Sequence, residues 1–381
     1  MKSRIQHLHR DQKGMTLVFV GASFMAFMAT STLAIDVGMF MTARTQAQNS
    51  ADSGALAGAV ALAFNSNTDR SASGPAVQSA INASRANNVI ATQVSVNPSD
   101  VTFVNDSFGQ PNAVRVNVYR TTARGNPVST LLGGIFGVTT ANVEATATAE
   151  ATRANAARCV APFAIPDRWT ERQTSPWDPT DTYNAFPANP SVLPDVYRAA
   201  NLGTYSGYNS QSNRGLQLTL HEASGTDITA GAYFPIQLPG SAGAADLQWN
   251  VSHCDDATMH FFDSMSKEPG SQATTIRQGV QDLIALDPAA YWDTATNRVV
   301  STQNPSPRVK IVPLVDPHYW NLGKLDGNYE QLKAANYIGF FIESISGNDI
   351  VGRITPVTAV IDPSAPQAPV GSFARVIRLI Q

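Results

Sequence analysis

The N-terminal part of the chain combines an uncharged apolar run with a longer stretch of small and polar residues. Residues 15–35, MTLVFVGASFMAFMATSTLAI, carry no charged side chain. About 20 such residues in a helix, at ~1.5 Å rise each, cross the ~30 Å hydrocarbon core of a bilayer. The pattern therefore predicts a transmembrane helix over residues 15–35.

Charges are distributed unequally on the two sides of this run. The side chains before it are mostly basic, namely Lys2, Arg4, Arg10 and Lys13, with Asp11 as the one acid. The first charge after it is Asp36. The positive-inside rule then keeps residues 1–14 in the cytoplasm and places everything beyond Asp36 on the other side of the membrane. A cleaved signal peptide is the alternative, since Ala29-Thr30-Ser31 offers small residues for cleavage, but the apolar run continues past them.

A stripe of small residues follows the apolar run, within a segment from Val37 to Phe64 that reads as helix. Residues four apart lie on one face of a helix. The small residues that share this face are Ala51, Gly54, Ala55, Gly58 and Ala59. Small side chains let another backbone approach closely, so we expect a helix-packing face, within the chain or between subunits. The alternative is that alanine is present only as a good helix former.

Residues 65–152 predict a small sheet with helices packed on it. Pro75 to Asn87 reads as a second, short helix. Apolar residues then alternate with polar ones around Val94, Val101, Val116 and residues 138–152, which is the period of half-buried strands. Residues 105–112 read as a hairpin connection, and Leu131, Leu132, Ile135 and Phe136 form an apolar patch between glycines.

Residues 153–381 change in character. Prolines are frequent from 162 to 190 and exclude long helices there. Thr274 to Ala285 is the best helix, and four segments read as strands: 309–315, 337–345, 351–360 and 373–380. The predicted fold class is α+β, with four parts: a cytoplasmic tail 1–14, a transmembrane helix 15–35, a helix and small sheet domain 36–152, and a β-rich extracytoplasmic domain 153–381.

Composition narrows the function classes. The formal net charge is −3 and charged residues make up 14% of the chain. With no basic patch, we expect no nucleic-acid partner. The two cysteines, Cys159 and Cys254, both lie outside the cytoplasm in this topology, where an oxidising compartment favours a disulfide. Two buried free thiols are the alternative.

Several stretches of the chain resemble the TadG-like proteins (TadE/TadG-like) of the tight-adherence, or Flp, pilus assembly system. The N-terminal match runs from Ala34 to Ala63, AIDVGMFMTARTQAQNSADSGALAGAVALA, with an Asp-Val-Gly at Asp36 and an Ala-Asp-x-x-Ala-Leu-Ala-Gly block ending at Gly58. The C-terminal matches are CVAPFAIPDRW (159–169), TIRQGVQDLIALDPAAYWD (275–293), RVKIVPLVDP (308–317) and IGFFIESISGNDIVGRITP (338–356).

The resemblance implies a non-enzymatic accessory protein of pilus biogenesis, anchored by a single pass in the bacterial inner membrane with its bulk in the periplasm or exposed at the surface. Its implied partners are the inner membrane, other pilus-assembly or pilin subunits, and a second copy of itself. Two family features are missing here. Phe19 stands where prepilin processing after Gly14 would need a glutamate, and the run from Asp263 to Lys267 departs from the metal motif of von Willebrand A domains.

The best cluster of metal-ligating residue types lies in HCDDATMHFFD. The candidate ligands are His253, Asp256, His260 and Asp263. On a helix these four side chains would share a face, and imidazole with carboxylate suits zinc, iron or manganese. A solvated polar face, or a loop held by Cys254, is the alternative, and we expect neither a metal nor another cofactor.

No catalytic constellation is visible. Ser264-x-x-Lys267 has the form of a serine–lysine nucleophile motif, but the Lys-Thr-Gly and Ser-Asp-Asn partner motifs of that chemistry are absent from the sequence. The five tryptophans, Trp169, Trp177, Trp249, Trp292 and Trp320, could line a glycan-binding surface, although core packing is the commoner role. The sequence therefore predicts no enzyme, and the alternative function is a periplasmic or secreted carbohydrate- or metal-binding protein with a cleaved leader.

Overall fold

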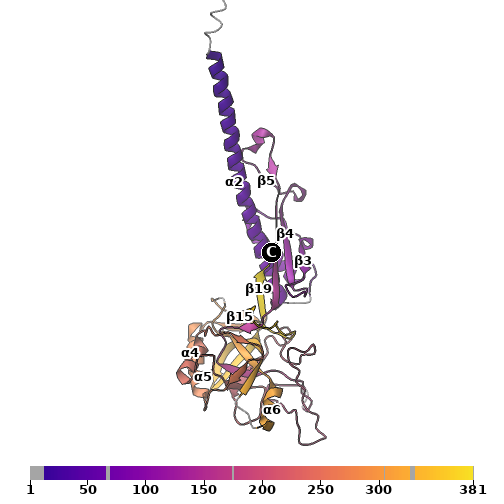
Figure 1. The fold of residues 1–381 in the computed structure, drawn as a ribbon, viewed down its shortest axis with the longest axis vertical. Helices are drawn as coiled ribbons and strands as arrows, with labels where there is room; N and C mark the ends of the chain where they lie inside the picture. The colour runs from indigo at the N-terminus through magenta and orange to yellow at the C-terminus, as the bar shows by residue number, and fades with distance from the viewer. Residues whose placement is uncertain (1–12, 66–68, 174–175, 304, 327–330, 381) are drawn as a thin grey trace, which may run out of the picture. The chain divides into compact units, whose positions relative to one another are not determined.

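The computed structural model describes residues 13–380 except 66–68, 174–175, 304 and 327–330 (Figure 1). The cytoplasmic tail expected at residues 1–14 lies almost entirely outside the described residues. The chain divides into two compact units. One comprises the residues up to Glu150 together with the last few from Arg378, and the other runs from Ala151 to Ile377.

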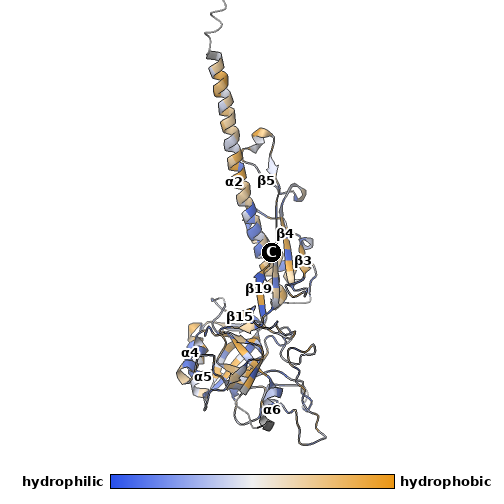
Figure 2. Cartoon of the chain, viewed as in Figure 1, coloured by the Kyte–Doolittle hydropathy of each residue, from blue (hydrophilic) through white to orange (hydrophobic). Residues whose placement is uncertain are grey.

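A single helix, α2 (Lys13–Phe64), dominates the first unit. Its 52 residues correspond to a length of about 78 Å. In the part of the chain that the structure describes, α2 is the one helix long and apolar enough to span a membrane. Figure 2 shows its first half coloured mostly apolar and a polar stretch following. The predicted transmembrane helix therefore continues without a break into the predicted small-residue helix.

The second helix of this unit, α3 (Pro75–Ala86), packs against α2, and both lie on a four-stranded sheet. Its strand order is β19 (Arg375–Leu379), β7 (Val143–Arg153), β4 (Ala113–Arg120) and β3 (Val101–Val104). The two pairs for which the register is given, β3–β4 and β4–β7, are antiparallel, with Ala113 opposite Glu150 and Arg120 opposite Val143. Alternate residues of β4 are buried under the helices, as the period of two predicts.

The connection from β4 to β7 lies at the Arg120 end of the sheet. It contains η2 (Thr122–Arg124), the paired strands β5 (Val128–Ser129) and β6 (Thr140–Ala141), and the 3₁₀ turn η3 (Gly133–Phe136) between them. Arg120 is buried and fixes the start of this connection. Its guanidinium donates to the carbonyls of Asn126 (2.7 Å) and Pro127 (3.1 Å), and also to the carbonyl of Val89.

The small remaining elements of the first unit lie beside α2, α3 and β4. They are the hairpin strands β1 (Asn88–Val89) and β2 (Thr92–Gln93) and the 3₁₀ turn η1 (Pro98–Asp100). The last strand differs from our expectation. We expected residues 373–380 to complete the distal domain, but β19 joins the small sheet, where Arg378 Nε donates to the buried Glu150 carboxylate at 2.6 Å. A buried carboxylate is costly without a charged partner, and this partner comes from the end of the chain.

Six strands of the second unit close into a barrel. The strands, in order around it, are β17 (Gln331–Ser346), β16 (Val309–Val315), β9 (Phe163–Pro166), β11 (Ala232–Pro235), β10 (Gln217–Glu222) and β18 (Asp349–Thr355), which pairs again with β17. The β16–β9 and β10–β11 pairs are parallel and the others are antiparallel. Closure leaves no strand edge within the barrel unpaired. A mostly β distal domain was predicted, and the structure confirms it.

Shorter elements surround the barrel. The helices are α4 (Ala244–Ser252), α5 (Ala273–Leu286) and α6 (Pro317–Asp326), and α5 packs on α4 and on β17 and β18. The short strands are β8 (Ala156–Ala157), β12 (Met259–His260), β13 (Ser264–Ser266), β14 (Tyr291–Asp293) and β15 (Arg298–Val300). The core inside includes Phe163, Tyr233, Leu314 and Phe340, all fully buried. The α+β fold class is therefore confirmed.

Candidate functional site

The most unusual polar group of the first unit is Asp36, the first charge after the apolar run. Although it stands on α2 at the end of the predicted membrane segment, its side chain is only 6% exposed. A buried carboxylate needs hydrogen-bond donors around it. The loop between β5 and β6 supplies them from a point 95 to 97 residues further along the chain.

Three consecutive backbone amides of this loop donate to the Asp36 carboxylate. Leu131 N–H lies 2.9 Å from Oδ1, Leu132 N–H 3.3 Å from both oxygens, and Gly133 N–H 2.6 Å from Oδ2. The approach is close at Gly133, where a Cβ atom would lie 2.8 Å from the Val138 carbonyl oxygen and 3.0 Å from Asp36 Oδ2. Asp36 therefore ties the loop to α2, and glycine at 133 makes room for it.

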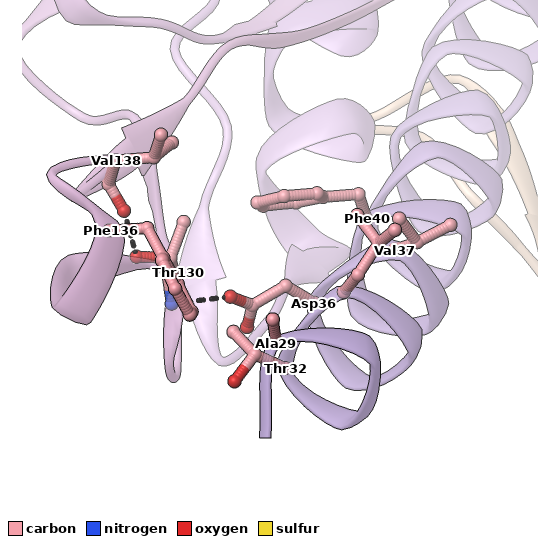
Figure 3. A pocket seen from close by; sticks show the side chains of 10 residues that line it. Ala29, Thr32, Asp36, Val37, Phe40, Thr130, Phe136 and Val138 are labelled. Atoms are coloured by element: carbon pink, nitrogen blue, oxygen red, sulfur yellow. Dashed lines mark hydrogen bonds between the residues drawn. The ribbon is translucent and has the colours of Figure 1, made fainter. Parts of the chain in front are cut away.

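An apolar groove of about 330 Å³ lies between α2 and this loop (Figure 3). On the helix side it is lined by Ala29, Thr32, Leu33, Asp36, Val37 and Phe40. On the loop side it is lined by Thr130, Gly133, Phe136 and Val138. The side-chain oxygens of Asp36 and Thr130 are both engaged, the latter by the Val138 carbonyl at 2.7 Å, as the dashed lines of Figure 3 show. The groove accordingly offers shape and apolar surface rather than reactive groups.

The small-residue face predicted on α2 lies against α3 and β4 of the same chain. Ala51, Ala55 and Ala59 are fully buried. A Cβ at Gly58 would lie 2.8 Å from Val114 Cγ1 and 3.2 Å from Ala80 Cβ, and one at Gly54 would lie 3.0 Å from the Ala80 carbonyl oxygen. Within the described residues, the contacts of this face are therefore intramolecular, one of the two arrangements that the sequence left open.

The two cysteines form the expected disulfide. Cys159 and Cys254 are joined across 95 residues, with their Cα atoms 4.5 Å apart. The bridge connects the segment before β9 with the segment that follows α4, so it closes a loop around half of the barrel strands.

The candidate metal ligands do not share a helix face. Helix α4 ends at Ser252, so His253 and Asp256 lie in the segment after it, and the His253 ring stacks on Trp249 at 3.4 Å. His260 Nε2 lies 2.9 Å from Asp362 Oδ2, and Asp263 accepts the His260 backbone N–H at 2.7 Å. Among the residues that the structure describes, no three His, Cys, Asp or Glu side chains gather in a way that could hold a metal ion.

Neither the serine–lysine motif nor the set of tryptophans forms a common site. Ser264 begins β13, while the Lys267 ammonium lies over the rings of Phe234 and Trp320. Of the tryptophans, Trp169, Trp292 and Trp320 are buried, Trp177 is half-buried, and Trp249 is 59% exposed. They therefore do not form one glycan-binding surface.

The second unit contains a fully buried carboxylate with a raised pKa, Asp167, which the sequence offered only as part of the block 159–169. Its Oδ2 accepts hydroxyl hydrogen bonds from Tyr205 (2.6 Å) and Tyr197 (2.8 Å), and its Oδ1 accepts the backbone N–H groups of Arg168 (2.8 Å) and Tyr208 (3.1 Å). Burial disfavours the charged form and raises the pKa of Asp167 to about 6, although these four hydrogen bonds act in the opposite direction.

The tyrosines of this cluster are held neutral. Burial, reinforced by the Asp167 charge, raises the pKa of Tyr205 and of Tyr197 well above the usual value of a phenol. Tyr205 Oη also accepts a hydrogen bond from Asn336 Nδ2 at 3.0 Å. Every hydrogen bond of the Asp167 carboxylate thus goes to the interior of this unit, which suits a structural network better than a site for a substrate.

Sequence reasoning did not single out the Asp36 loop contact. Two signals for it were present: the chain has no charged residue from Gly125 to Val143, and an apolar patch lies between glycines inside that stretch. What the sequence lacked was the pairing of this patch with Asp36, because the two are far apart along the chain.

Two family models match the chain. One, described as Flp pilus-assembly TadE/G-like, matches residues 14–61, and the other, described as Tad-like Flp pilus-assembly, matches residues 41–149. Together they span the first unit from the start of α2 into β7. No curated protein and no solved structure is significantly similar to the chain.

Proposed function

We propose, from the match of residues 14–149 to Flp pilus-assembly family models, that this chain works as a membrane-anchored, non-enzymatic accessory through protein–protein contacts in the periplasm. The same match supports the accessory role in pilus assembly. Anchoring, orientation and the mode of action are the proposed part.

The observation that carries the proposal is the continuity of α2. The same helix provides the apolar segment of residues 15–35 and then the buried face of Ala51, Ala55 and Ala59 in the core of the first unit. A helix is a stiff connection, so the folded part of this unit is held directly at the membrane surface rather than on a flexible tether. That arrangement suits a protein that presents a surface to an assembly in the envelope.

The non-enzymatic part rests on how the polar clusters are used. Asp36 is occupied by loop amides, Asp167 by two tyrosines and two amides, and Glu150 by Arg378 and by Ser107, whose backbone and hydroxyl both donate to it. The hydrogen bonds of each of these carboxylates connect separate segments of the chain. Their hydrogen bonds leave no obvious position for a reacting group.

The test is genetic complementation in a bacterium that makes Flp pili and carries this gene. Deleting the gene should abolish or sharply reduce surface pili, and the full chain should restore them. A version in which residues 1–35 are replaced by a cleavable leader should be exported but should not restore pili. Normal piliation of the deletion strain would contradict the accessory role, and restoration by the leader version would contradict the need for an anchor.

Orientation is tested separately by protease accessibility. Before digestion, the whole chain should fractionate with the membranes of the spheroplasts. Added protease should then degrade the part of the chain beyond residue 36, because the basic N-terminal side favours the cytoplasm. Protection of the bulk of the chain in intact spheroplasts would show the opposite orientation. A soluble periplasmic product lacking the first 30 or so residues would show a cleaved leader instead.

A further inference from the structure

The loop that Asp36 holds has an apolar outer surface that nothing in the described chain covers. Four large apolar side chains of this loop are mostly exposed: Leu131 (68%), Ile135 (66%), Phe136 (57%) and Val138 (54%). Exposed apolar patches of this kind mark contact sites for proteins or membranes. We define the apolar loop as residues 131–138.

The position of the apolar loop along α2 identifies what it meets. The groove beside it is lined by Ala29, Thr32 and Leu33, which belong to the predicted membrane segment, and by Val37 and Phe40 beyond it. Ala29 lies six residues before the end of that segment, about 9 Å along the helix axis. Interfacial elements bury their apolar faces ~5–10 Å into the boundary between headgroups and acyl chains. With residues 15–35 spanning the membrane as proposed above, the apolar loop would lie at that depth.

We propose that the apolar loop inserts into the outer leaflet of the inner membrane beside α2, and that the groove between them accommodates a phospholipid acyl chain. The inference rests on the membrane anchoring proposed above and adds a second membrane contact to it. Asp36 positions the loop, since its carboxylate satisfies the amides of Leu131, Leu132 and Gly133 that hydrocarbon would otherwise leave without partners.

The chemistry of the surface favours lipid over a second copy of the chain. No charged residue occurs from Gly125 to Val143, and the Asp36 charge is already engaged by the loop. The apolar loop is also continuous with the exposed apolar face of α2, where Leu33 and Val37 are uncovered. A protein interface at this edge would be expected to offer polar groups on its rim, whereas a surface facing acyl chains does not require them.

Fluorescence quenching by brominated lipids tests the insertion. The full chain is reconstituted in phospholipid vesicles with acyl chains brominated near the headgroup, and a tryptophan is added by Phe136→Trp. The emission of this reporter is obtained by subtracting the emission of the unsubstituted chain, so that the five natural tryptophans do not contribute to it. We expect this reporter to lose about half of its emission, because residues at the headgroup–acyl boundary contact the brominated positions.

The matched control is Phe108→Trp. Phe108 is also a partly exposed loop phenylalanine of the first unit, but it lies in the hairpin between β3 and β4. The register of β4 with β7 places that hairpin at the opposite end of the sheet from the apolar loop. The Phe108 reporter should therefore not be quenched. A second reporter, Ile135→Trp, repeats the measurement should Phe136→Trp disturb the fold.

The outcomes separate this inference from the anchoring on which it rests. Carbonate-resistant membrane association reports the anchor alone. If the chain remains associated and neither loop reporter is quenched more than the control, loop insertion is wrong while the anchor stands. Quenching that is absent at the working ratio of protein to lipid, and appears only after dilution in excess lipid, would also overturn the proposal. It would show that a second copy of the chain covers the loop and that lipid reaches it only when the copies separate. Unchanged quenching of the 136 reporter after Asp36→Ala would contradict the positioning role of Asp36.

Discussion

Gly133 lies where the backbone of the apolar loop passes closest to α2. Alanine there would place its Cβ 2.8 Å from the Val138 carbonyl oxygen and 3.1 Å from Thr130 Cβ. We predict that Gly133→Ala pushes the loop away from Asp36 and weakens their hydrogen bonds, at a cost of about 1–3 kcal/mol in local stability. Hydrogen exchange of the Leu131 to Gly133 amides in the reconstituted protein measures this cost.

Gly134 is the matched control for this prediction. It follows Gly133 in the same turn, and a Cβ at this position meets nothing within 4 Å. Gly134→Ala should therefore leave amide exchange in the loop unchanged. Equal exchange rates in the two variants would mean that the close approach at Gly133 does not stabilise the loop.

Asp167 predicts a pH dependence for the second unit. Its pKa is about 6 in the folded protein against 3.8 ordinarily, so between these values the folded state binds more protons than the unfolded state. Stability then falls as pH rises from about 4 to 6, by on the order of 3 kcal/mol, and is flat with respect to this group above that window. Denaturant unfolding of the detergent-solubilised chain at several pH values measures this slope.

Asp167→Asn identifies the source of the slope. The amide does not titrate and keeps one oxygen to accept the two backbone N–H groups, so most of the decline should disappear. Asp195 is also buried, and burial raises its pKa to about 6, so it titrates in the same window. Asp195→Asn should therefore remove its own share of the slope and leave the share of Asp167. A slope that survives in Asp167→Asn and vanishes in Asp195→Asn would show that our assignment is wrong.

At the scale of elements, the stability of the first unit depends on the packing of α2 against α3. At Gly58 an added side chain meets Val114 Cγ1 on β4 and Ala80 Cβ on α3, and the Ala80 Cβ cannot move without shifting the backbone of α3. We predict that Gly58→Leu destabilises the first unit by about 1–3 kcal/mol or more, since overpacking forces backbone shifts, and that pilus assembly falls with it. Gly54→Leu should behave alike, because its added atoms meet Ser84 and Ala80.

Gly38 provides the control on the same helix. It meets nothing within 4 Å, so Gly38→Leu adds a side chain to α2 without a clash. Thermal unfolding and pilus counts should be close to those of the unsubstituted chain, and membrane insertion should be intact in all three variants. Normal stability of Gly58→Leu would mean that α2 and α3 tolerate separation and that the small-residue face is not required.

At the scale of the whole molecule, the disulfide is the covalent constraint on the second unit. A loop of 95 residues closed by a bridge gives about 4.7 kcal/mol in the chain-entropy model, a large part of a typical stability of ~5–15 kcal/mol. We predict that Cys159→Ser and Cys254→Ser each make this unit protease-sensitive, and that the double variant is no worse than either single one. Limited proteolysis of the three variants measures the effect.

Thiol alkylation under denaturing, non-reducing conditions shows directly whether the bridge forms in the cell. Protein taken from the native envelope should not react until it is reduced. Immediate labelling of both cysteines would contradict the bridge in the cell. The proposed membrane anchor would be unaffected by that result, because it rests on residues 15–35 alone.

The local pattern of apolar and polar residues was sufficient to predict the longer helices and strands. The apolar run and small residues predicted α2, the apolar positions of residues 274–285 predicted α5, and alternation predicted β4. The short apolar run of residues 309–315 predicted β16. Each of these signals lies within one segment. The family resemblance followed from sequence motifs, and the disulfide from the oxidising compartment expected for the two cysteines. Short strands such as β9 and β11, with four residues each, carry too few positions for a period to be recognised.

Tertiary structure alone decided which distant segments meet. The six-strand barrel pairs β9 with β16 across about 150 residues, and β19 leaves the distal segment to pair with β7, neither of which a local pattern can specify. The same is true of Asp36 and Gly133, and of Asp167 with its tyrosines. Such contacts depend on which buried polar groups find partners once the chain has folded, whereas periodicity records only which face of a segment is buried.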